Sequence, residues 1–353
     1  MTLKVAIIAD DLTGALDTGT PFVDAGLSVA VAIEIEAVED ALATGCEVVV
    51  VNTASRALPE GEAARRAGLA ASALLAAHPA IVLKKIDSRL KGNVAAESAA
   101  IAAIFGHREI TIAPAIPDQE RFTRDGHVVG RGVEKPLSIA ALFKGRSDRV
   151  SIIDAESDAD LDRLASEHDW TAALAVGARG IGSALARRIG HAGKPVRNFQ
   201  ATDKTIFAFG SRDPITSTQM QRLEASGMLT ATIEAPMGAL AQGDQPSLPV
   251  LIRCTGAITE DAVGVARRFA QGVKSVIENT RPDMLMVGGG DTALAVFRQL
   301  GISVLSPKGE IEAGVPWFDV TAADGAGFRC AVKSGGFGNS ESLLRVIPQN
   351  QAA

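Results

Sequence analysis

Short strand patterns alternate with helical patterns along the first half of the chain, and this alternation constrains the fold more than any other feature. Apolar runs typical of buried strands lie at residues 3–9, 47–52, 81–86, 109–116, 149–154 and 171–176. Alanine-rich helical patterns occupy the intervals at 61–78 and 93–105. Such alternation predicts a parallel sheet covered by helices on both of its faces.

A second unit is expected to begin near Lys204, because the polar stretch 193–203 is typical of a linker. It carries strand patterns at 205–209, 283–287 and 328–332 and a long amphipathic helix at 259–279. A chain of 353 residues can form two domains with proper cores. We therefore expect an α/β fold of two three-layer domains, 1–200 and 204–347, with mainly parallel sheets and a cleft between them. The sequence shows no internal repeat.

Composition excludes several classes of protein. The net charge is -6 and aromatic residues make up 4% of the chain, with no Tyr, so neither a basic face nor stacking platforms for nucleic acid are expected. No apolar run approaches 18 residues, so we expect no membrane span. Three distant cysteines and the absence of a secretion signal favour a reducing compartment, and we expect a cytoplasmic protein.

Two adjacent carboxylates, Asp10 and Asp11, follow the first strand, and Thr13 and Gly14 then open a helix. In open α/β sheets, ligands bind at the carboxyl ends of strands, where backbone amides and helix N-termini are free. Two carboxylates there are costly unless they bind a hydroxyl, a metal or a cation. Asp11 and Thr13 could equally be helix caps, since Asp and Thr favour that position. Both interpretations stay open.

A cation-rich segment, residues 84–93, leaves the strand at 81–86 and enters the next helix. Its Arg and Lys side chains would suit an anionic substrate such as a carboxylate. The alternative is a solvated charge run in which Asn93 caps a helix. Residues 114–118 and a hairpin predicted at Asp125-Gly126 would then form a rim over this pocket.

The second unit contains three glycine-rich strand ends, at 210–211, 288–292 and 333–338. Glycine lets backbone amides point together at a phosphate, and Ser, Thr and Lys add donors and charge. None of the three matches the Walker pattern, and the glycines at 177–182 lack the spacing of the dinucleotide fingerprint. A single loop of this kind would usually be a tight turn, but three in one unit favour a nucleotide phosphate site.

An anion site in one unit and a phosphate site in the other suggest phosphoryl transfer. Such catalysis depends mostly on positioning and charge neutralisation, with one carboxylate to accept the proton of the attacking hydroxyl. It normally needs magnesium, held by few carboxylates and by the phosphates themselves. No two histidines have metal-ligand spacing, and the sequence does not identify the metal ligands.

These motifs run in the order found in the four-carbon acid sugar kinases, a family that the chain resembles over nearly its whole length. The resemblance also rests on Asp17-Thr18-Gly19, Thr216, and Gly314-Val315-Pro316. It implies that residues 1–200 bind a tetronate-type acid and that residues 204–347 bind ATP. Arg89 and Lys91 stand where many members have Thr and Arg, which bears on the identity of the substrate.

On this interpretation the chain is an ATP-dependent kinase that phosphorylates the terminal hydroxyl of a small sugar acid. Asp11 is the expected general base and Asp10 the partner of the hydroxyl or metal, although the reverse order is open. Arg89 is expected to bind the carboxylate. The expected substrate-binding residues are Asp10, Asp87, Ser88, Arg89, Lys91 and Asn93. The expected nucleotide ligands are Ser211, Gly289, Gly290, Thr292, Lys333, Gly335, Gly336 and Gly338.

Two alternatives remain at this point: a kinase of another small hydroxy acid, and a non-catalytic protein that binds a nucleotide or metabolite. The expected cofactors are ATP and magnesium, and the expected partners are small molecules, with neither nucleic acid nor membrane among them. A homodimer is compatible with the sequence, which does not itself determine the oligomeric state.

Overall fold

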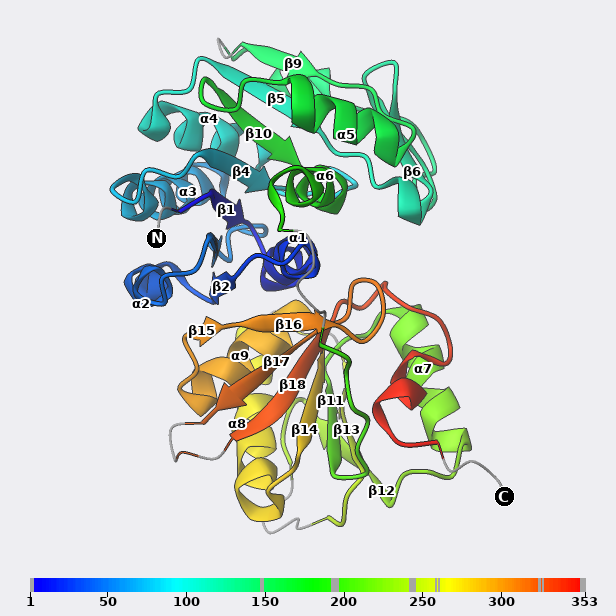
Figure 1. Ribbon diagram of the computed structural model, residues 1–353. Helices are drawn as coiled ribbons and strands as arrows, with labels where there is room; N and C mark the ends of the chain where they lie inside the picture. The colour runs from blue at the N-terminus through cyan, green and yellow to red at the C-terminus, as the bar shows by residue number, and fades with distance from the viewer. Residues whose placement is uncertain are drawn as a thin grey trace. The chain divides into compact units, whose positions relative to one another are not determined.

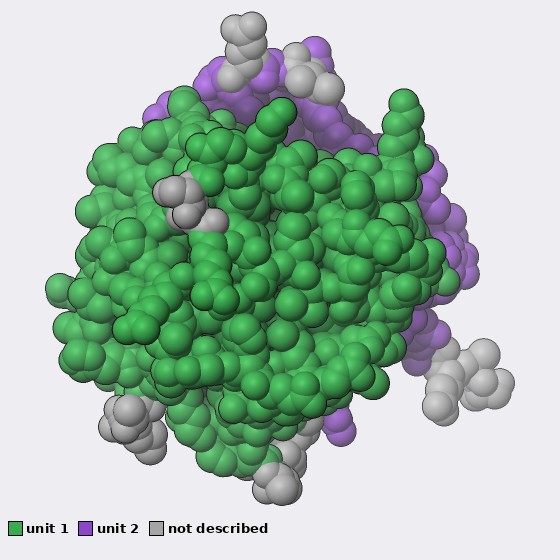
Figure 2. Space-filling view, turned by 90° about the horizontal axis from the view of Figure 1, so that it is seen from above, with its two compact units in different colours: residues 1–196 green, residues 197–353 purple. Residues whose placement is uncertain are grey.

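The computed structural model describes residues 3–146, 149–191, 197–240, 246–257, 259, 261–322, 325 and 327–349. The chain divides into two compact units, Met1–Val196 and Arg197–Ala353, which are drawn in different colours in Figure 2. Each unit is built on a mainly parallel sheet with helices packed against it (Figure 1). The predicted α/β class with two mainly parallel sheets is confirmed.

The first unit contains a parallel sheet in the order β2-β3-β1-β4-β10-β5-β9. Its strands are β1 (Val5–Ala9), β2 (Val29–Ala32), β3 (Val48–Asn52), β4 (Ile81–Lys85), β5 (Glu109–Ala113), β9 (Val150–Ile152) and β10 (Ala173–Gly177). The central strands β1, β3, β4 and β10 are buried along their whole length, as expected for parallel strands covered on both faces.

Helices cover both faces of this sheet (Figure 1). They are α1 (Leu12–Asp24), α2 (Val38–Ala43), α3 (Glu60–Leu75), α4 (Val94–Phe105), α5 (Asp158–Glu167) and α6 (Arg179–Ile189), with short 3-10 turns η1 (Ile35–Ala37), η2 (Pro117–Gln119) and η3 (Ala140–Phe143). Helices α1, α5 and α6 pack side by side, and α3 packs against α4. Among the described residues, no helix is both long enough and apolar enough to span a membrane.

A small antiparallel sheet interrupts the alternation where the sequence predicted a hairpin. It consists of β6 (Arg121–Arg124), β7 (His127–Gly130) and β8 (Leu137–Ser138). Asp125 and Gly126 form the turn with φ angles of 49° and 70°. Asp and Gly tolerate this left-handed backbone, which the tight hairpin turn requires. The hairpin prediction is therefore confirmed.

The second unit contains a mixed sheet in the order β12-β13-β11-β14-β18-β17-β16, antiparallel only at its β18-β17-β16 edge. The strands of this sheet are β11 (Thr205–Phe209), β12 (Ala231–Pro236), β13 (Val250–Thr255), β14 (Met284–Gly288), β16 (Pro307–Glu310), β17 (Pro316–Thr321) and β18 (Gly327–Lys333), and the unit also contains the short strand β15 (Val304–Leu305). The helices are α7 (Pro214–Ala225), α8 (Ala262–Thr280) and α9 (Gly290–Leu300), with the 3-10 turn η4 (Ser342–Val346). A core cluster including Phe207, Trp317 and Leu343 joins this sheet to α7 and η4.

Both sheets arrange their first four strands in the same order. Strand β1 lies between β3 and β4, and strand β11 lies between β13 and β14. The chain therefore builds one side of each sheet and then crosses to the other side of the first strand. Ligands of parallel α/β sheets bind at the carboxyl ends of the strands where the order reverses in this way. The ends of β1 and β4, and those of β11 and β14, are thus the expected ligand positions.

The glycines between β10 and α6 have a packing role. A Cβ atom at Gly177 would lie 2.4 Å from the carbonyl oxygen of Ala113, and one at Gly180 would lie 2.2 Å from that of Ala115. The missing side chains let α6 approach the backbone that follows β5. This accounts for glycines that lack the spacing of a dinucleotide-binding loop.

We predict opposite effects of adding a methyl group at two helical glycines. Gly180→Ala should lower the free energy of unfolding by about 1–3 kcal/mol, because the added atom overpacks the contact with Ala115. Gly68→Ala in α3, where a Cβ would meet nothing within 4 Å, should raise it by about 0.5–1 kcal/mol. Urea unfolding of both variants measures the two changes, and a similar loss in both would contradict this account of α6 packing.

Candidate functional site

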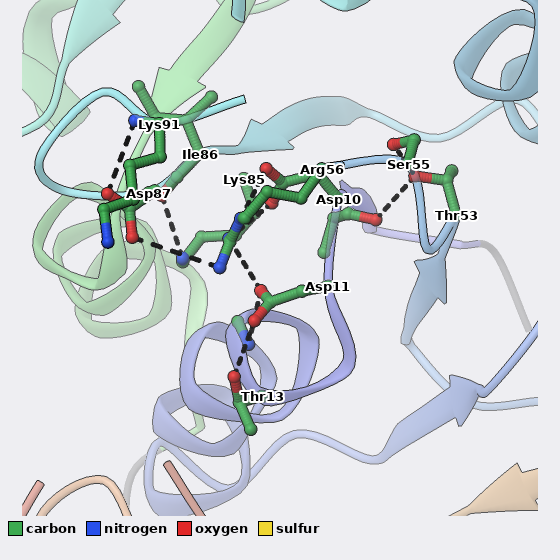
Figure 3. A network of polar contacts seen from close by, with 12 residues as sticks. Asp10, Asp11, Thr13, Thr53, Ser55, Arg56, Lys85, Ile86, Asp87 and Lys91 are labelled. Carbon is green, nitrogen blue, oxygen red and sulfur yellow. Dashed lines mark hydrogen bonds and ion pairs between the residues drawn. The ribbon is translucent and has the colours of Figure 1, made fainter. Parts of the chain in front are cut away.

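Two carboxylates at the end of β1 share one guanidinium group (Figure 3). Arg56, in the loop after β3, donates from Nε to Oδ2 of Asp10 at 2.9 Å and from Nη2 to Oδ1 of Asp10 at 2.7 Å. Its Nη2 also donates to Oδ1 of Asp11 at 2.8 Å. The Asp10 side chain is 3% exposed, whereas that of Asp11 is 23% exposed. One carboxylate is therefore buried and the other is accessible.

Electrostatics keep this cluster ionised. Burial by itself would raise the pKa of Asp10, but Lys84, the bonds from Arg56 and the charge of Lys85 together lower it. Burial would likewise lower the pKa of Arg56, but Asp10, Asp11 and Asp87 raise it above its usual value. Ion pairing thus outweighs the cost of desolvation for both partners. Asp10 and Arg56 therefore carry fixed opposite charges at neutral pH.

Asp11 also caps helix α1. Its Oδ1 accepts the backbone N–H of Gly14 at 3.0 Å, and its Oδ2 accepts the hydroxyl of Thr13 at 2.6 Å. A Cβ at Gly14 would lie 2.4 Å from Asp11 Oδ1 and 2.9 Å from Lys85 Nζ, so only glycine fits there. The cap interpretation is therefore confirmed, and the same bonds fix the orientation of an accessible carboxylate.

A buried network holds the Arg56 loop in place. The carbonyl oxygen of Asp10 accepts the N–H groups of Ser55 at 3.0 Å and of Arg56 at 3.2 Å. The Ser55 hydroxyl donates to Glu97 at 2.7 Å, and Glu97 forms an ion pair with Lys84. The side chains of Lys84 and Glu97 are each 1% exposed. The position of Arg56 is thus fixed through its backbone as well as through its guanidinium group.

The loop after β4 brings several predicted substrate residues to the same sheet edge. Asp87 Oδ1 accepts the backbone N–H groups of Arg89 at 2.9 Å and of Lys91 at 3.4 Å, and Asp87 Oδ2 lies 4.0 Å from Arg56. Gly92 lies against Asp10, where a Cβ would be 3.0 Å from its Oδ2. The side chains of Arg89 and Lys91 are exposed. The loop is therefore organised around Asp87 and in contact with the carboxylate cluster.

Two further predicted residues of this loop make protein contacts. Ser88 accepts a hydrogen bond from Nη1 of Arg121, the first residue of the hairpin. Asn93 donates from its side-chain amide to the carbonyl oxygen of Leu58 at 2.9 Å, and its side chain makes no capping bond to α4. Asn93 thus connects the loop after β4 to the loop after β3.

Sequence reasoning missed Arg56 and Arg121, and it included Lys85 in the cation-rich segment without giving it a role of its own. Arg56 follows a strand end rich in polar residues, 52–55, and the parallel arrangement places that end beside the end of β1. This pattern could have indicated Arg56. Lys85 is buried and donates to the carbonyl oxygen of Ile86 at 2.9 Å. No local signal separates Arg121 from a solvated hairpin residue.

The second unit contains a pocket of about 330 Å³ at the carboxyl ends of β11 and β14. Four predicted nucleotide ligands line it: Ser211, Gly289, Gly290 and Thr292. The remaining lining residues are Gly210, Arg212, Cys254, Thr259, Ala262, Val265, Ala266, Phe269 and Asp291. The pocket therefore has a polar side made by glycine turns and an apolar side made mainly by helix α8.

Glycine geometry shapes the polar side of this pocket. Gly289 has φ of 102° and immediately precedes helix α9, so the first amides of that helix border the pocket. A Cβ at Gly210 would lie 2.1 Å from Thr292 Oγ1, so this residue allows the loop and the helix to touch. Helix N-termini and closely approaching backbone amides are typical of phosphate sites.

Lys333 at the end of β18 is fully buried and fixes the third glycine-rich loop. Its Nζ donates to Thr216 Oγ1 at 3.1 Å and to the carbonyl oxygens of Ser334 at 2.9 Å and Gly335 at 3.2 Å. These bonds engage all three N–H groups of the ammonium. Thr216 in turn donates to Gly335 at 2.8 Å. The structure places Lys333 inside the loop, as a support for its backbone.

The glycines of this loop differ in their surroundings. A Cβ at Gly335 would lie 2.6 Å from Ser211 Oγ, so the loop borders the pocket residue Ser211. Gly336 is exposed, and a Cβ there would have only Asp213 within 4 Å. Gly338 has φ of 81°, and a Cβ there would lie 2.3 Å from Oγ of Ser342, so the backbone at this position is in close contact with η4. Of the three, Gly336 has the surroundings that a phosphate-facing residue needs.

Among the residues that the structure describes, no group of three or more His, Cys, Asp or Glu side chains could hold a metal ion. Magnesium usually binds through one or two carboxylates, water and substrate phosphates. Asp291 is the acidic residue in the pocket lining, beside Thr292. This donor set suits magnesium that arrives with nucleotide phosphates.

Two family models match the chain, a sugar-binding N-terminal domain over residues 5–138 and a nucleotide-binding C-terminal domain over residues 206–343. A D-threonate kinase from Bordetella bronchiseptica is 27% identical over 97% of this chain and 96% of its own. A 3-oxo-tetronate kinase from Methylobacterium radiotolerans is 28% identical over 98% of this chain and 99% of its own. A crystal structure from Salmonella typhimurium LT2, provisionally described as a tRNA synthase, shares the fold, with a TM-score of 0.76, 19% identity and coverage of 97% and 98%.

The buried Lys333 predicts a pH dependence of stability. Burial lowers its pKa to about 8, against the opposing effects of Asp213 and Glu312, whereas an unfolded lysine titrates near 10.5. Between these values the unfolded chain binds more protons than the folded chain. The Lys333 contribution to the free energy of unfolding should therefore rise with pH across that window, by about 3 kcal/mol.

Urea unfolding at several pH values between 7.5 and 10.5 measures this contribution. In Lys333→Met, the free energy of unfolding should no longer show the increase with pH that Lys333 gives the wild type. Lys204→Met, which alters an exposed lysine, should retain this increase. If wild type and Lys333→Met gave parallel curves, Lys333 would not titrate in this window.

Proposed function

The chain belongs to the family of four-carbon acid sugar kinases, and we propose that it transfers the γ-phosphoryl group of ATP to the terminal hydroxyl of a tetronate-type acid. The observation that carries the proposal is the accessible carboxylate of Asp11, held beside Arg56 at a strand-order reversal in the sugar-binding part of the chain. The glycine-lined pocket of the second unit supports the proposal, because glycine turns and a helix N-terminus suit phosphates.

Asp11 is the proposed general base. It is more exposed than Asp10, and three bonds, from Thr13, Gly14 and Arg56, orient it without a further conformational change. The substrate hydroxyl would give its proton to Asp11 as its oxygen bonds to the γ-phosphorus and the bond to the β-phosphate oxygen breaks. Asp10 is almost fully buried and paired, so we assign it a positioning role toward Arg56. Most of the rate enhancement would come from orientation.

The loop after β4 is the proposed site for the rest of the acid. Asp87 and Ser88 are fixed near the carboxylate cluster, and their side chains would form hydrogen bonds with the hydroxyl groups of the substrate. Arg89 and Lys91 are exposed and would supply positive charge. Asn93 is engaged with the neighbouring loop and would act as a support.

In the second unit, we propose that the phosphates bind Ser211, Gly289, Gly290 and Thr292, with Gly335 and Gly336 at the border. The apolar side of the pocket, from Val265 to Phe269, would accept the adenine ring. Asp291 would hold magnesium together with the phosphates, and magnesium would neutralise charge that develops on them. Lys333 would support the loop from inside.

The proposal is tested by ADP formation from ATP and magnesium in the presence of single acids: threonates, erythronates and their oxo forms. We expect acid-dependent ADP release with one of them, and a phosphomonoester on its terminal carbon by NMR. Turnover only with acids of another chain length would indicate a different hydroxy acid kinase. Thermal stabilisation by acid and ATP without any ADP would indicate a non-catalytic binding protein.

A glycine substitution tests the nucleotide site. Gly336→Val should weaken binding of a non-hydrolysable ATP analogue by at least about tenfold, because the side chain would block close approach of the phosphate to the backbone. The fold should tolerate the change, since Gly336 is exposed and has a negative-φ backbone. Gly327→Val, at the exposed start of strand β18, which leads into this loop, is the matched control. Unchanged affinity in folded Gly336→Val would mean that this loop is only a turn.

A further inference from the structure

The hairpin presents an immobilised guanidinium group beside the loop after β4. Arg121 donates from Nη1 to the hydroxyl of Ser88 and from Nε to the carbonyl oxygen of Arg131 at 3.1 Å. It is half-buried. Of its five N–H groups, these two bonds engage one on Nε and one on Nη1. Both N–H groups on Nη2 and one on Nη1 are left, and a carboxylate can accept two parallel bonds from one N–H of each of these nitrogens.

Positive charge accumulates around this group. Burial lowers the pKa of Arg121, and the charges of Arg89 and Arg131 lower it further, while Asp87 opposes them. Within the described part of the chain, no hydrogen bond or ion pair engages the side chain of Arg89 or Arg131. Asp87 is itself shared with Arg56 and with two backbone amides. Arg121 thus lies in the field of two further guanidinium groups and of one carboxylate, Asp87, which it shares with Arg56. This leaves a positive charge that an anion would neutralise.

The other cations of this sheet edge are already paired. Arg56 is bonded to Asp10 and Asp11, Lys84 forms a buried ion pair with Glu97, and Lys85 donates to the backbone. Their charges are already set against those of nearby carboxylates: Asp10 and Asp11 for Arg56, Glu97 for Lys84, and Asp10 for Lys85. The cations left for the substrate are those around the hairpin and Lys91.

We propose that Arg121 is the residue that binds the carboxylate of the substrate, and that it makes the site selective for acids over uncharged polyols. This inference rests on the proposed function and changes the residue expected from the sequence, which was Arg89. Arg121 is favoured because its guanidinium is held by two native bonds, so little side-chain freedom is lost on binding. Arg89 is exposed and would have to be ordered by the ligand, so it contributes less.

Two substrates of equal length separate recognition of the carboxylate from every other effect. One is the four-carbon acid that the enzyme phosphorylates, and the other is the tetritol that carries CH₂OH in place of the carboxylate. For Arg121→Ala we expect kcat/KM for the acid to fall by about 100-fold, mostly through KM, while the value for the tetritol changes less than threefold. Arg121→Lys, which keeps the charge without the planar fork, should fall in between.

Arg124→Ala is the matched control, because Arg124 lies on the same strand β6, is exposed and pairs with Glu156. It should behave as wild type with both substrates, and Arg89→Ala should lose less than tenfold for the acid. If the tetritol is not turned over, the dissociation constants of both compounds, from calorimetry, replace kcat/KM.

The inference would be overturned if Arg121→Ala lowered kcat/KM equally for the acid and the tetritol. It would also be overturned if Arg89→Ala lost more selectivity for the acid than Arg121→Ala does. A failure of the proposed function gives a different result, namely no acid-dependent ADP in wild type. Acid binding by wild type and its loss in Arg121→Ala would still be measured by calorimetry in that case, so the two failures are distinguishable.

Discussion

The bidentate pairing of Arg56 with Asp10, and the bond from the same guanidinium to Asp11, is the interaction on which the site depends. Two carboxylates at one strand end would repel each other and would lose ionisation on burial, and one shared cation removes both problems. It also ties the loop after β3 to the end of β1, against which Gly92 of the loop after β4 is packed. Three chain segments thus converge on a single charge. Removal of Arg56 would leave Asp10 buried without its partner, which is far more costly than the loss of a surface ion pair.

One topological rule places both ligand sites. In each unit the first strand lies between the third and the fourth, so two loops diverge at its carboxyl end and leave room for a ligand. The first unit fills that position with carboxylates and cations, and the second fills it with glycine turns and the start of helix α9. The shared strand order does not show as a sequence repeat, because parallel strands require only buried apolar residues and the loops carry different chemistry. Function therefore resides in the loops, and the sheets supply their positions.

The parts of this account that follow from local sequence were predictable. The alternating apolar patterns predicted a sheet between two layers of helices, and Asp125-Gly126 predicted the hairpin. Both predictions depend only on residues that are close together in the sequence. Contacts between distant residues were not predictable. Arg56 lies 46 residues from Asp10, and the polar strand end before it indicates a site residue only once β3 is known to lie beside β1. Arg121 lies 33 residues from Ser88, and nothing near it separates it from a solvated charge. A lysine beside glycines suggests phosphate binding, but only the tertiary structure shows that Lys333 is buried with its three donors engaged.

The most direct test of the central claim, that Arg56 and its partners hold Asp11 as an accessible base, is single-turnover phosphoryl transfer by Asp11→Asn. Asn caps helices as well as Asp, and its side chain can still accept from Gly14 and pair with the Thr13 hydroxyl, so α1 should persist. The account predicts a rate reduced roughly 10²- to 10⁴-fold with nearly unchanged nucleotide affinity. A rate close to that of wild type, in a folded variant, would contradict it and would place the base elsewhere.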